Sequence, residues 1–539
     1  MEVESLNIPA INKFASQYLK QEEPVPSFFH YNVNSSSVYT DRMKDLASRQ
    51  FQREDLAECI SSYMKSLPSS EKVEESLGKL RNDAVTVIAG QQAGLMTGPL
   101  YTIHKIISVI QLARQQEAEL KHPVVPVFWI AGEDHDYQEV NHIYVEKGSK
   151  LEKIGYPERI TEKKMTSHIT YKKTVMKKWL DDILVILGET EHTNQLASDL
   201  TKMIDEEEDI VRFFAHFVMS LFKDFGLLVI DSAYPLLRKL ESRHFHHLIE
   251  NSQSITDKVL EQQEEIRKNG YGPQLDISPL AANLFIQLQD ERALLEREGN
   301  KFFEKNSGKA YSNLELLSIL DESPESFSNN VVTRPMMQEW LFPTLAFVAG
   351  PGEIAYWGEL KKAFEYVDLK MPPVVPRLNI TIVEREIDKR IQDLQLTLHG
   401  VITEGVSTAR DAFWKSLERP GLEIEMKEIQ EELQRKYEKI REQAVSIDQG
   451  LHPIIDKNLE FHLSQFDYLR NKVDKALKDK NSLTFNQFMK VENSIRPNEG
   501  PQERTWNVLY FLNKYGPYFV KDLTLLEFTF DGTHKVVYI

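Results

Sequence analysis

The chain has 539 residues, which is too long for one hydrophobic core and predicts several domains. Its 65 basic and 82 acidic side chains give a formal net charge of −17, a field that repels nucleic acid and anionic lipid, so we expect neither as a partner. The first residues lack the features of a secretory signal, and no run approaches the roughly 20 apolar residues that span a bilayer. We therefore expect a cytoplasmic protein without membrane association.

The single cysteine, Cys59, argues against disulfides and thiolate-rich zinc sites. It shares one helical stripe with Phe51, Leu56, Ile60 and Met64, which favours a buried thiol over a reactive one. Metal ligands would have to be histidines and carboxylates, and we predict no metal site.

Short apolar runs predict the strands of a parallel α/β core. After helical patterns in residues 1–80, AVTVIAG at 84–90 is followed by the helical pattern LYTIHKIISVIQLARQQ and by HPVVPVFWIAG at 122–132, which together indicate a βαβ unit. Three later runs complete the predicted sheet: GLLVIDSA at 226–233, FPTLAFVAG at 342–350 and MPPVVPRLNITIVE at 371–384. The stretches between these runs are charged and predict mostly helical insertions.

The C-terminal part changes to long, charged helices. Apolar residues at steps of three and four form two seams, from Met426 to Ile447 and from Ile455 to Leu477, and GLHP at 450–453 separates them. We predict an antiparallel helical hairpin, and the sequence leaves open whether it dimerises as a coiled coil or packs as an intramolecular bundle. The last residues predict two strands joined by an Asp-Gly turn, docked on the core.

These patterns divide the chain into five parts. They are a first half of the core with N-terminal helices at 1–150, a helical insertion at 151–225, a second half of the core at 226–383 with an insertion at about 240–330, a helical coiled-coil domain at 384–495 and a C-terminal segment at 496–539.

The loop after the first predicted strand is a candidate ligand site. It leads into a helix N-terminus, where free N–H groups favour an anion, and it contains Gln91, Gln92 and Gly98. It is neither a Walker A loop nor a dinucleotide fingerprint. The next residues, Pro99-Leu100-Tyr101-Thr102-Ile103-His104, resemble the Pro-Leu-His-Ile-Gly-His signature of nucleotidyltransferases such as class I aminoacyl-tRNA synthetases. Tyr101 replaces the first histidine and Ile103 the glycine, which disfavours the usual pose of the adenine ring.

A second candidate site follows the second predicted strand, in Trp129-Ile130-Ala131-Gly132-Glu133-Asp134-His135-Asp136. Open α/β sheets bind ligands at the carboxyl ends of their strands. Close carboxylates raise one another's pKa, and together with a histidine they suit acid/base work or the recognition of an amine. The alternatives are a solvated charged loop and, less favoured, a metal site.

Two further candidates lie at the ends of later strands. Gly350-Pro351-Gly352-Glu353 forms another turn between strand and helix, similar to the glycine-rich turn that contacts the nucleotide or aminoacyl group in the synthetase-like class. The alternative is that Glu353 is only a favourable charge at a helix start. Arg377, two residues before Asn379, has the fork geometry that grips a carboxylate, although a plain salt bridge is the alternative.

These motifs and the late PQERTWNVLYFLNKYG, taken in order over essentially the whole chain, resemble the bacillithiol biosynthesis cysteine-adding family. The resemblance implies an α/β fold with a Rossmann-like nucleotidyltransferase core, connecting-peptide insertions and a helical coiled-coil domain. From the helical pattern we expect this domain to form a homodimer. It implies a ligase that adds cysteine to glucosaminyl-malate through an amide bond, the last step of bacillithiol biosynthesis. Two rival functions are a nucleotidyltransferase that makes an activated, adenylate-type intermediate and a non-catalytic coiled-coil scaffold.

On this hypothesis each candidate residue has a role. We expect His104 to help stabilise an anion and three residues after the second strand to do acid/base work or recognise the amine, namely Asp134, His135 and Asp136. The expected substrate contacts are Gln91, Gln92, Gly98, Tyr101, Trp129, Glu133, Arg377 and Asn379. ATP or ADP is the expected nucleotide, and its expected contacts are Gly350, Gly352, Glu353, Arg496, Gln502 and Arg504.

Overall fold

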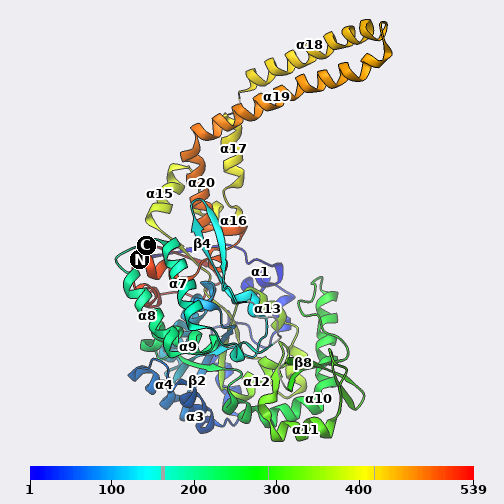
Figure 1. The fold of residues 1–539 in the computed structure, drawn as a ribbon. Coiled ribbons are helices and arrows are strands. Elements are labelled where there is room, and N and C mark those ends of the chain that lie inside the picture. The colour runs from blue at the N-terminus through cyan, green and yellow to red at the C-terminus, as the bar shows by residue number, and fades with distance from the viewer. Residues whose placement is uncertain (159–163, 289–290, 418) are drawn as a thin grey trace. The chain divides into compact units, whose positions relative to one another are not determined.

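The computed structural model describes residues 1–158, 164–288, 291–417 and 419–539 (Figure 1). The chain forms two compact units. The first comprises residues 1–147, 151–382 and 500–539, and the second comprises residues 148–150 and 383–499. Within the described ranges, no helix is both long and apolar enough to cross a membrane.

The first unit is built on a five-stranded parallel sheet, as predicted. Its strands lie in the order β13-β12-β2-β3-β6. Since β2 is the first of them in the chain, the strand order reverses beside β2, which is the arrangement of a doubly wound, Rossmann-like fold. The bounds are β2 (Val85–Gln91), β3 (Val124–Ile130), β6 (Leu228–Asp231), β12 (Thr344–Ala349) and β13 (Val374–Pro376).

Helices cover this sheet because the strands are apolar on both faces. The crossover from β2 to β3 is α5 (Tyr101–Leu120), which buries Ile103, Ile106 and Ile107. Cys59 is buried on α3 (Arg53–Met64), as predicted, and burial raises the pKa of its thiol to about 12. The four N-terminal helices are α1 (Lys13–Lys20), α2 (Val38–Ala47), α3 (Arg53–Met64) and α4 (Glu71–Arg81).

The insertion at 151–225 is largely helical, but the later one differs from the prediction. After α10 (Pro235–Lys268) the chain forms an antiparallel sheet in the order β10-β9-β8-β7-β11. The physical reason is a period of two in β7 (Ala281–Leu288), where Leu284 and Ile286 are buried and alternate with the more exposed Phe285 and Gln287. The helices of the earlier insertion are α7 (Lys173–Leu187), α8 (Thr193–Glu206) and α9 (Ile210–Phe222), and the remaining elements of the later one are β8 (Glu291–Glu298), β9 (Lys301–Glu304), β10 (Ala310–Ser312), α11 (Asn313–Glu322) and β11 (Phe327–Asn329).

The single strand predicted at 371–384 is two strands in the structure. The chain leaves the parallel sheet after β13 and then forms β14 (Ile380–Val383), which pairs with β15 (His534–Tyr538) in a separate sheet. On its other edge β15 pairs antiparallel with β1 (Glu2–Leu6). The predicted C-terminal hairpin is therefore wrong, because β15 takes its partners from distant segments.

The second unit contains the predicted helical hairpin. Helices α18 (Pro420–Val445) and α19 (His452–Lys480) run antiparallel beside each other (Figure 1). Arg441 pairs with Asp456 and Arg470 pairs with Glu423 across the hairpin. Three apolar side chains of the predicted seams are still about half exposed, Ile429 at 50%, Ile440 at 48% and Leu469 at 47%.

A buried ion pair anchors the N-terminal helices to the sheet. Arg42 on α2 donates from Nε to the carbonyl of Thr344 at 2.9 Å, at the start of β12. Its guanidinium also pairs with Glu339 on α12 (Thr333–Leu341), and both side chains are only 1% exposed. Arg49 supplies a second contact to the same carboxylate.

We predict that Arg42→Met lowers the free energy of unfolding by about 3–5 kcal/mol, because it removes one partner of a buried carboxylate. Arg81→Met is the matched control, since its contacts to Glu54 and Glu58, 3.6 Å each, lie at the surface and should contribute less than about 1 kcal/mol. Chemical denaturation measures both. Equal losses in the two variants would contradict this account of the anchor.

Candidate active site

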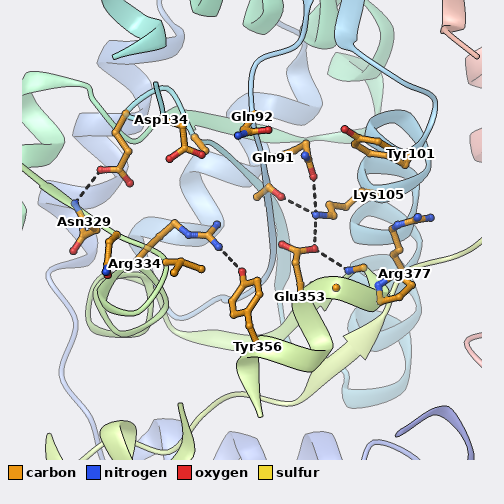
Figure 2. Close-up of a pocket in the computed structure, with 18 of the residues that line it drawn as sticks. Gln91, Gln92, Tyr101, Lys105, Asp134, Asn329, Arg334, Glu353, Tyr356 and Arg377 are labelled. Atoms are coloured by element: carbon orange, nitrogen blue, oxygen red, sulfur yellow. Dashed lines mark hydrogen bonds and ion pairs between the residues drawn. The ribbon is translucent and has the colours of Figure 1, made fainter. Parts of the chain in front are cut away.

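A pocket of about 360 Å³ lies at the carboxyl ends of β2, β3, β12 and β13 (Figure 2). In open α/β folds the ligand crevice forms at this edge, where the strand order reverses. Ten of the predicted site residues line the pocket: Gln91, Gln92, Tyr101, Glu133, Asp134, Gly350, Gly352, Glu353, Arg377 and Arg504. The structure thus brings together segments from four parts of the first unit.

Lys105, which the sequence analysis did not single out, holds two of these segments together. Its ammonium group donates to the carbonyl of Gly90 at 2.8 Å, to Oε1 of Gln91 at 3.0 Å and to Oε2 of Glu353 at 2.6 Å (Figure 2). Burial lowers the pKa of Lys105, and Glu353 opposes that effect. All three ammonium protons have acceptors inside the protein.

Glu353 also caps its own helix. It lies in the first turn of α13 (Pro351–Trp357), and the amide of Gly350 donates to its Oε2 at 2.8 Å. These contacts agree with the alternative that we gave for Glu353, a favourable charge at the start of a helix. The side chain of Glu353 therefore already occupies an amide group at this helix start that could otherwise bind a ligand anion.

Arg377 is held by a carboxylate from the C-terminal segment. Its Nη1 and Nη2 atoms donate to the two oxygens of Glu503 at 2.7 and 2.5 Å. The bidentate grip on a substrate carboxylate that we predicted is thus already used inside the protein. If residue 350 carried a Cβ atom, that atom would lie 3.6 Å from Nε of Arg377, so the Nε edge of the guanidinium faces the Gly350 turn.

His104 lies behind Arg377 and does not line the pocket. Its Nδ1 atom is 2.9 Å from Oε2 of Glu503, and its ring is fully buried. Burial lowers the pKa of His104, which keeps the imidazole neutral. Burial would raise the pKa of Glu503, but Arg377 and His104 hold it well below its usual range. The three side chains form a chain that ends at the pocket wall.

The two carboxylates after β3 differ in their partners. Glu133 is buried, pairs with Arg238 and accepts a hydrogen bond from the amide of Asn329 at 3.2 Å. Asp134 is half-buried, and its carbonyl accepts from the amide and hydroxyl of Thr166 at 2.8 and 2.7 Å. Burial raises the pKa of Asp134, an effect that Arg292 partly offsets. Asp134 therefore has the character of a proton acceptor.

Three residues predicted near Asp134 do not line the pocket. Trp129 is fully buried in β3 and packs edge-on against Phe342, with ring centroids 6.2 Å apart. Nδ1 of His135 is 3.3 Å from Nη1 of Arg292. Asp136 is exposed at the start of the short helix that follows. The structure gives Trp129 a packing role, because its position in the strand directs it into the core.

Four other predicted residues also lie outside the pocket lining. Gln502 is engaged with β14, since it accepts from the amide of Ile382 at 2.8 Å and donates to the carbonyl of the same residue at 2.7 Å. The carbonyl of Gly98 accepts from Asn507 at 2.7 Å, and that of Asn379 accepts from the amide of Lys535 at 2.8 Å. Arg496 belongs to the second unit, where it donates to the carbonyl of Ile402 at 2.7 Å.

Arg334 and Tyr356 also line the pocket and were missed. Nη2 of Arg334 donates to the hydroxyl of Tyr356 at 2.6 Å (Figure 2). Tyr356 lies on α13, three residues after the predicted turn that ends at Glu353. Arg334 lies in the helix that precedes β12, where no local motif marks it.

Comparison with known proteins gives the family. The family model "Bacillithiol biosynthesis BshC, N-terminal Rossmann-like domain" matches residues 1–378, and "Bacillithiol biosynthesis BshC, C-terminal coiled-coil domain" matches residues 380–539. The chain belongs to the BshC family of bacillithiol biosynthesis. Relatives from Bacillus licheniformis, Geobacillus sp. (strain WCH70) and Geobacillus kaustophilus are 39%, 41% and 40% identical, each over the full length of both chains, and are named "Putative cysteine ligase BshC".

A buried carboxyl group lies under the loop that carries Asp134. Asp231, at the end of β6, accepts from the hydroxyl of Ser167 at 2.7 Å and from the amide of Ala233 at 3.0 Å. A Cβ on Gly132 would come within 2.2 Å of its Oδ1, so the loop approaches as closely as a glycine allows. Burial raises the pKa of Asp231 to about 6.

This shift predicts a pH-dependent stability. Asp231 ionises near pH 4 in the unfolded chain and near pH 6 in the folded chain. The free energy of unfolding therefore falls by about 3 kcal/mol as the pH rises from 4 to 6. Asp231→Asn keeps an acceptor for Ala233 and cannot ionise. The free energy of unfolding of Asp231→Asn minus that of the native chain should therefore rise by up to about 3 kcal/mol from pH 4 to pH 7. A difference that does not change with pH in denaturant titrations would rule this out.

Proposed function

We propose that this pocket joins the carboxyl group of cysteine to the amine of glucosaminyl-malate, the amide-forming last step of bacillithiol biosynthesis. The observation that carries the proposal is that one cavity holds both a carboxyl group with a raised pKa, Asp134, and several cationic side chains. Membership of the BshC family and the ligase names of the relatives support the substrates.

Amide formation makes three demands on the site. The amine has to lose a proton, the carboxylate has to be activated and the tetrahedral oxyanion has to be stabilised. Asp134 accepts the amine proton, because its raised pKa brings it nearer to the pKa of an ammonium group. The cations of the pocket oppose the developing negative charge in a partly desolvated space.

In this proposal His104 is a positioning residue. It holds Glu503, which holds both terminal nitrogens of Arg377, so its effect reaches the pocket through two contacts. Its buried, neutral ring suits that task better than direct contact with substrate.

ATP is the energy source that we propose for activating the carboxylate. Among the residues predicted to contact a nucleotide, Arg504 is suited to an anion, because it is exposed on the pocket wall and its side chain has no ionic or hydrogen-bond partner within the described residues. Glu353 and Gln502 are less suited, since both are engaged inside the protein. Omission of ATP from the assay tests the requirement directly.

Replacement of the proposed base tests the function. With cysteine, glucosaminyl-malate and ATP, the protein should form bacillithiol, and Asp134→Asn should lower kcat by about 10²–10⁴-fold because it removes the proton acceptor. Asp182→Asn, on the surface of α7, is the control and should keep native activity. Mass spectrometry of the product measures both.

Other outcomes would support the rival functions. ATP–pyrophosphate exchange driven by an acid other than cysteine would indicate a nucleotidyltransferase. Full activity in Asp134→Asn would refute its role, and normal bacillithiol levels in cells that carry this variant and His104→Ala would favour a scaffold.

We also propose that the chain is a homodimer through the α18–α19 hairpin. The half-exposed Ile429, Ile440 and Leu469 support this, since coiled-coil partners bury such side chains. The double variant Ile429→Lys/Ile440→Lys should be monomeric by light scattering while the native chain is a dimer. A monomeric native chain would contradict the proposal, as would a variant that still dimerises.

A further inference from the structure

Four cationic side chains line the pocket, and they differ in burial and in the contacts that they already make: Lys105, Arg334, Arg377 and the exposed Arg504. Lys105 has Glu353 and two further acceptors, and Arg377 has both oxygens of Glu503. The hydrogen-bond partner of Arg334 is the neutral hydroxyl of Tyr356. Within the described residues no carboxylate forms an ion pair with Arg334, although it is half-buried. Burial lowers the pKa of Arg334, but the nearby Tyr356 and Glu353 raise it, so the guanidinium is charged although no described carboxylate holds it by contact. Its remaining donors can therefore bind the anion of a ligand.

The position of Arg334 suits a ligand contact. It lies in the first turn of α12, and Figure 2 shows its side chain extending into the pocket toward Tyr356. A Cβ on Gly90 would lie 3.1 Å from Nη1 of Arg334, so the guanidinium reaches the end of β2. Tyr356 engages Nη2. Among the residues that the structure describes, this leaves Nη1 and Nε as further donors for an incoming carboxylate.

We propose that Arg334 binds a carboxylate of the malyl group of glucosaminyl-malate and that Tyr356 positions its guanidinium. This inference rests on the proposed function. The cysteine carboxyl group loses its charge when it is activated and converted to an amide. The malyl carboxylates remain charged from substrate to product, so a fixed guanidinium is matched to them throughout the reaction.

Arg334 then determines substrate specificity without taking part in the proton transfer. Asp134 acts on the sugar amine, whereas Arg334 recognises the acidic end of the same molecule. A glucosamine derivative without the malyl group should therefore bind weakly, and its affinity should not depend on Arg334.

Calorimetric titration with glucosaminyl-malate tests this. Arg334→Gln should weaken binding by about 10- to 100-fold, the range for loss of a hydrogen bond to a charged group. Arg334→Lys should recover part of the affinity, because it keeps the charge without the fork. Tyr356→Phe should weaken binding less than Arg334→Gln and raise KM with little change in kcat. Arg267→Gln, an exposed arginine on α10, is the control and should bind as the native chain does.

Methyl glucosaminide, which has the sugar but no carboxylate, separates specificity from misfolding. Its weak affinity should be equal in the native chain and Arg334→Gln, and the circular dichroism spectra should match. Native affinity of Arg334→Gln for glucosaminyl-malate would overturn the inference and leave the ligase function standing. If the native chain neither binds glucosaminyl-malate nor forms bacillithiol, the proposed function fails and the inference fails with it.

Discussion

β2, β3, β12 and β13 run in one direction, and the loops at their carboxyl ends therefore meet at one edge of the sheet. This constraint brings Gln91, Asp134, Glu353 and Arg377 to one pocket although up to 286 residues separate them, from 91 to 377. No local interaction would bring such distant residues together. The site is thus a consequence of strand direction and strand order, and the side chains at the loop ends determine its chemistry.

Charge pairing then determines which of these side chains remain open to a ligand. Lys105 with Glu353, Arg377 with Glu503 and Glu133 with Arg238 are compensated inside the protein. Such pairs contribute little net stability when buried, but they hold the surrounding loops in fixed positions. Arg334 and Asp134 have no such ion pair within the described residues and are half-buried, whereas the unpaired Arg504 is exposed. We therefore assign the carboxylate and the amine of one substrate to Arg334 and Asp134.

Much of the core was predictable because buried parallel strands are continuous apolar runs. The runs at 84–90, 122–132, 226–233 and 342–350 each overlap a strand of the observed sheet. The antiparallel sheet in the later insertion was missed because charged residues in β8 obscured a period of two. The prediction of a single strand at 371–384 was wrong because an apolar run does not show where the chain moves from one sheet to another.

The site was predicted less completely than the fold. Glycine turns and acidic residues directly after strands marked most of the ten predicted lining residues, including Asp134 and Glu353, whereas Tyr101, Arg377 and Arg504 were predicted on other grounds. The burial of His104 and the pairing of Arg377 with Glu503 were not predictable, since both depend on a segment more than 120 residues away in the chain. Arg334 comes from a helix that leads into a strand, and such positions have no signature in sequence.

A crystal structure of the protein soaked with glucosaminyl-malate and cysteine would test the central claim most directly. The account predicts electron density for the sugar amine beside Asp134 and for both substrates within the pocket at the carboxyl ends of β2, β3, β12 and β13. Density for these substrates in the second unit, or in the cavity lined by Leu200, Phe217 and Leu512, would contradict it.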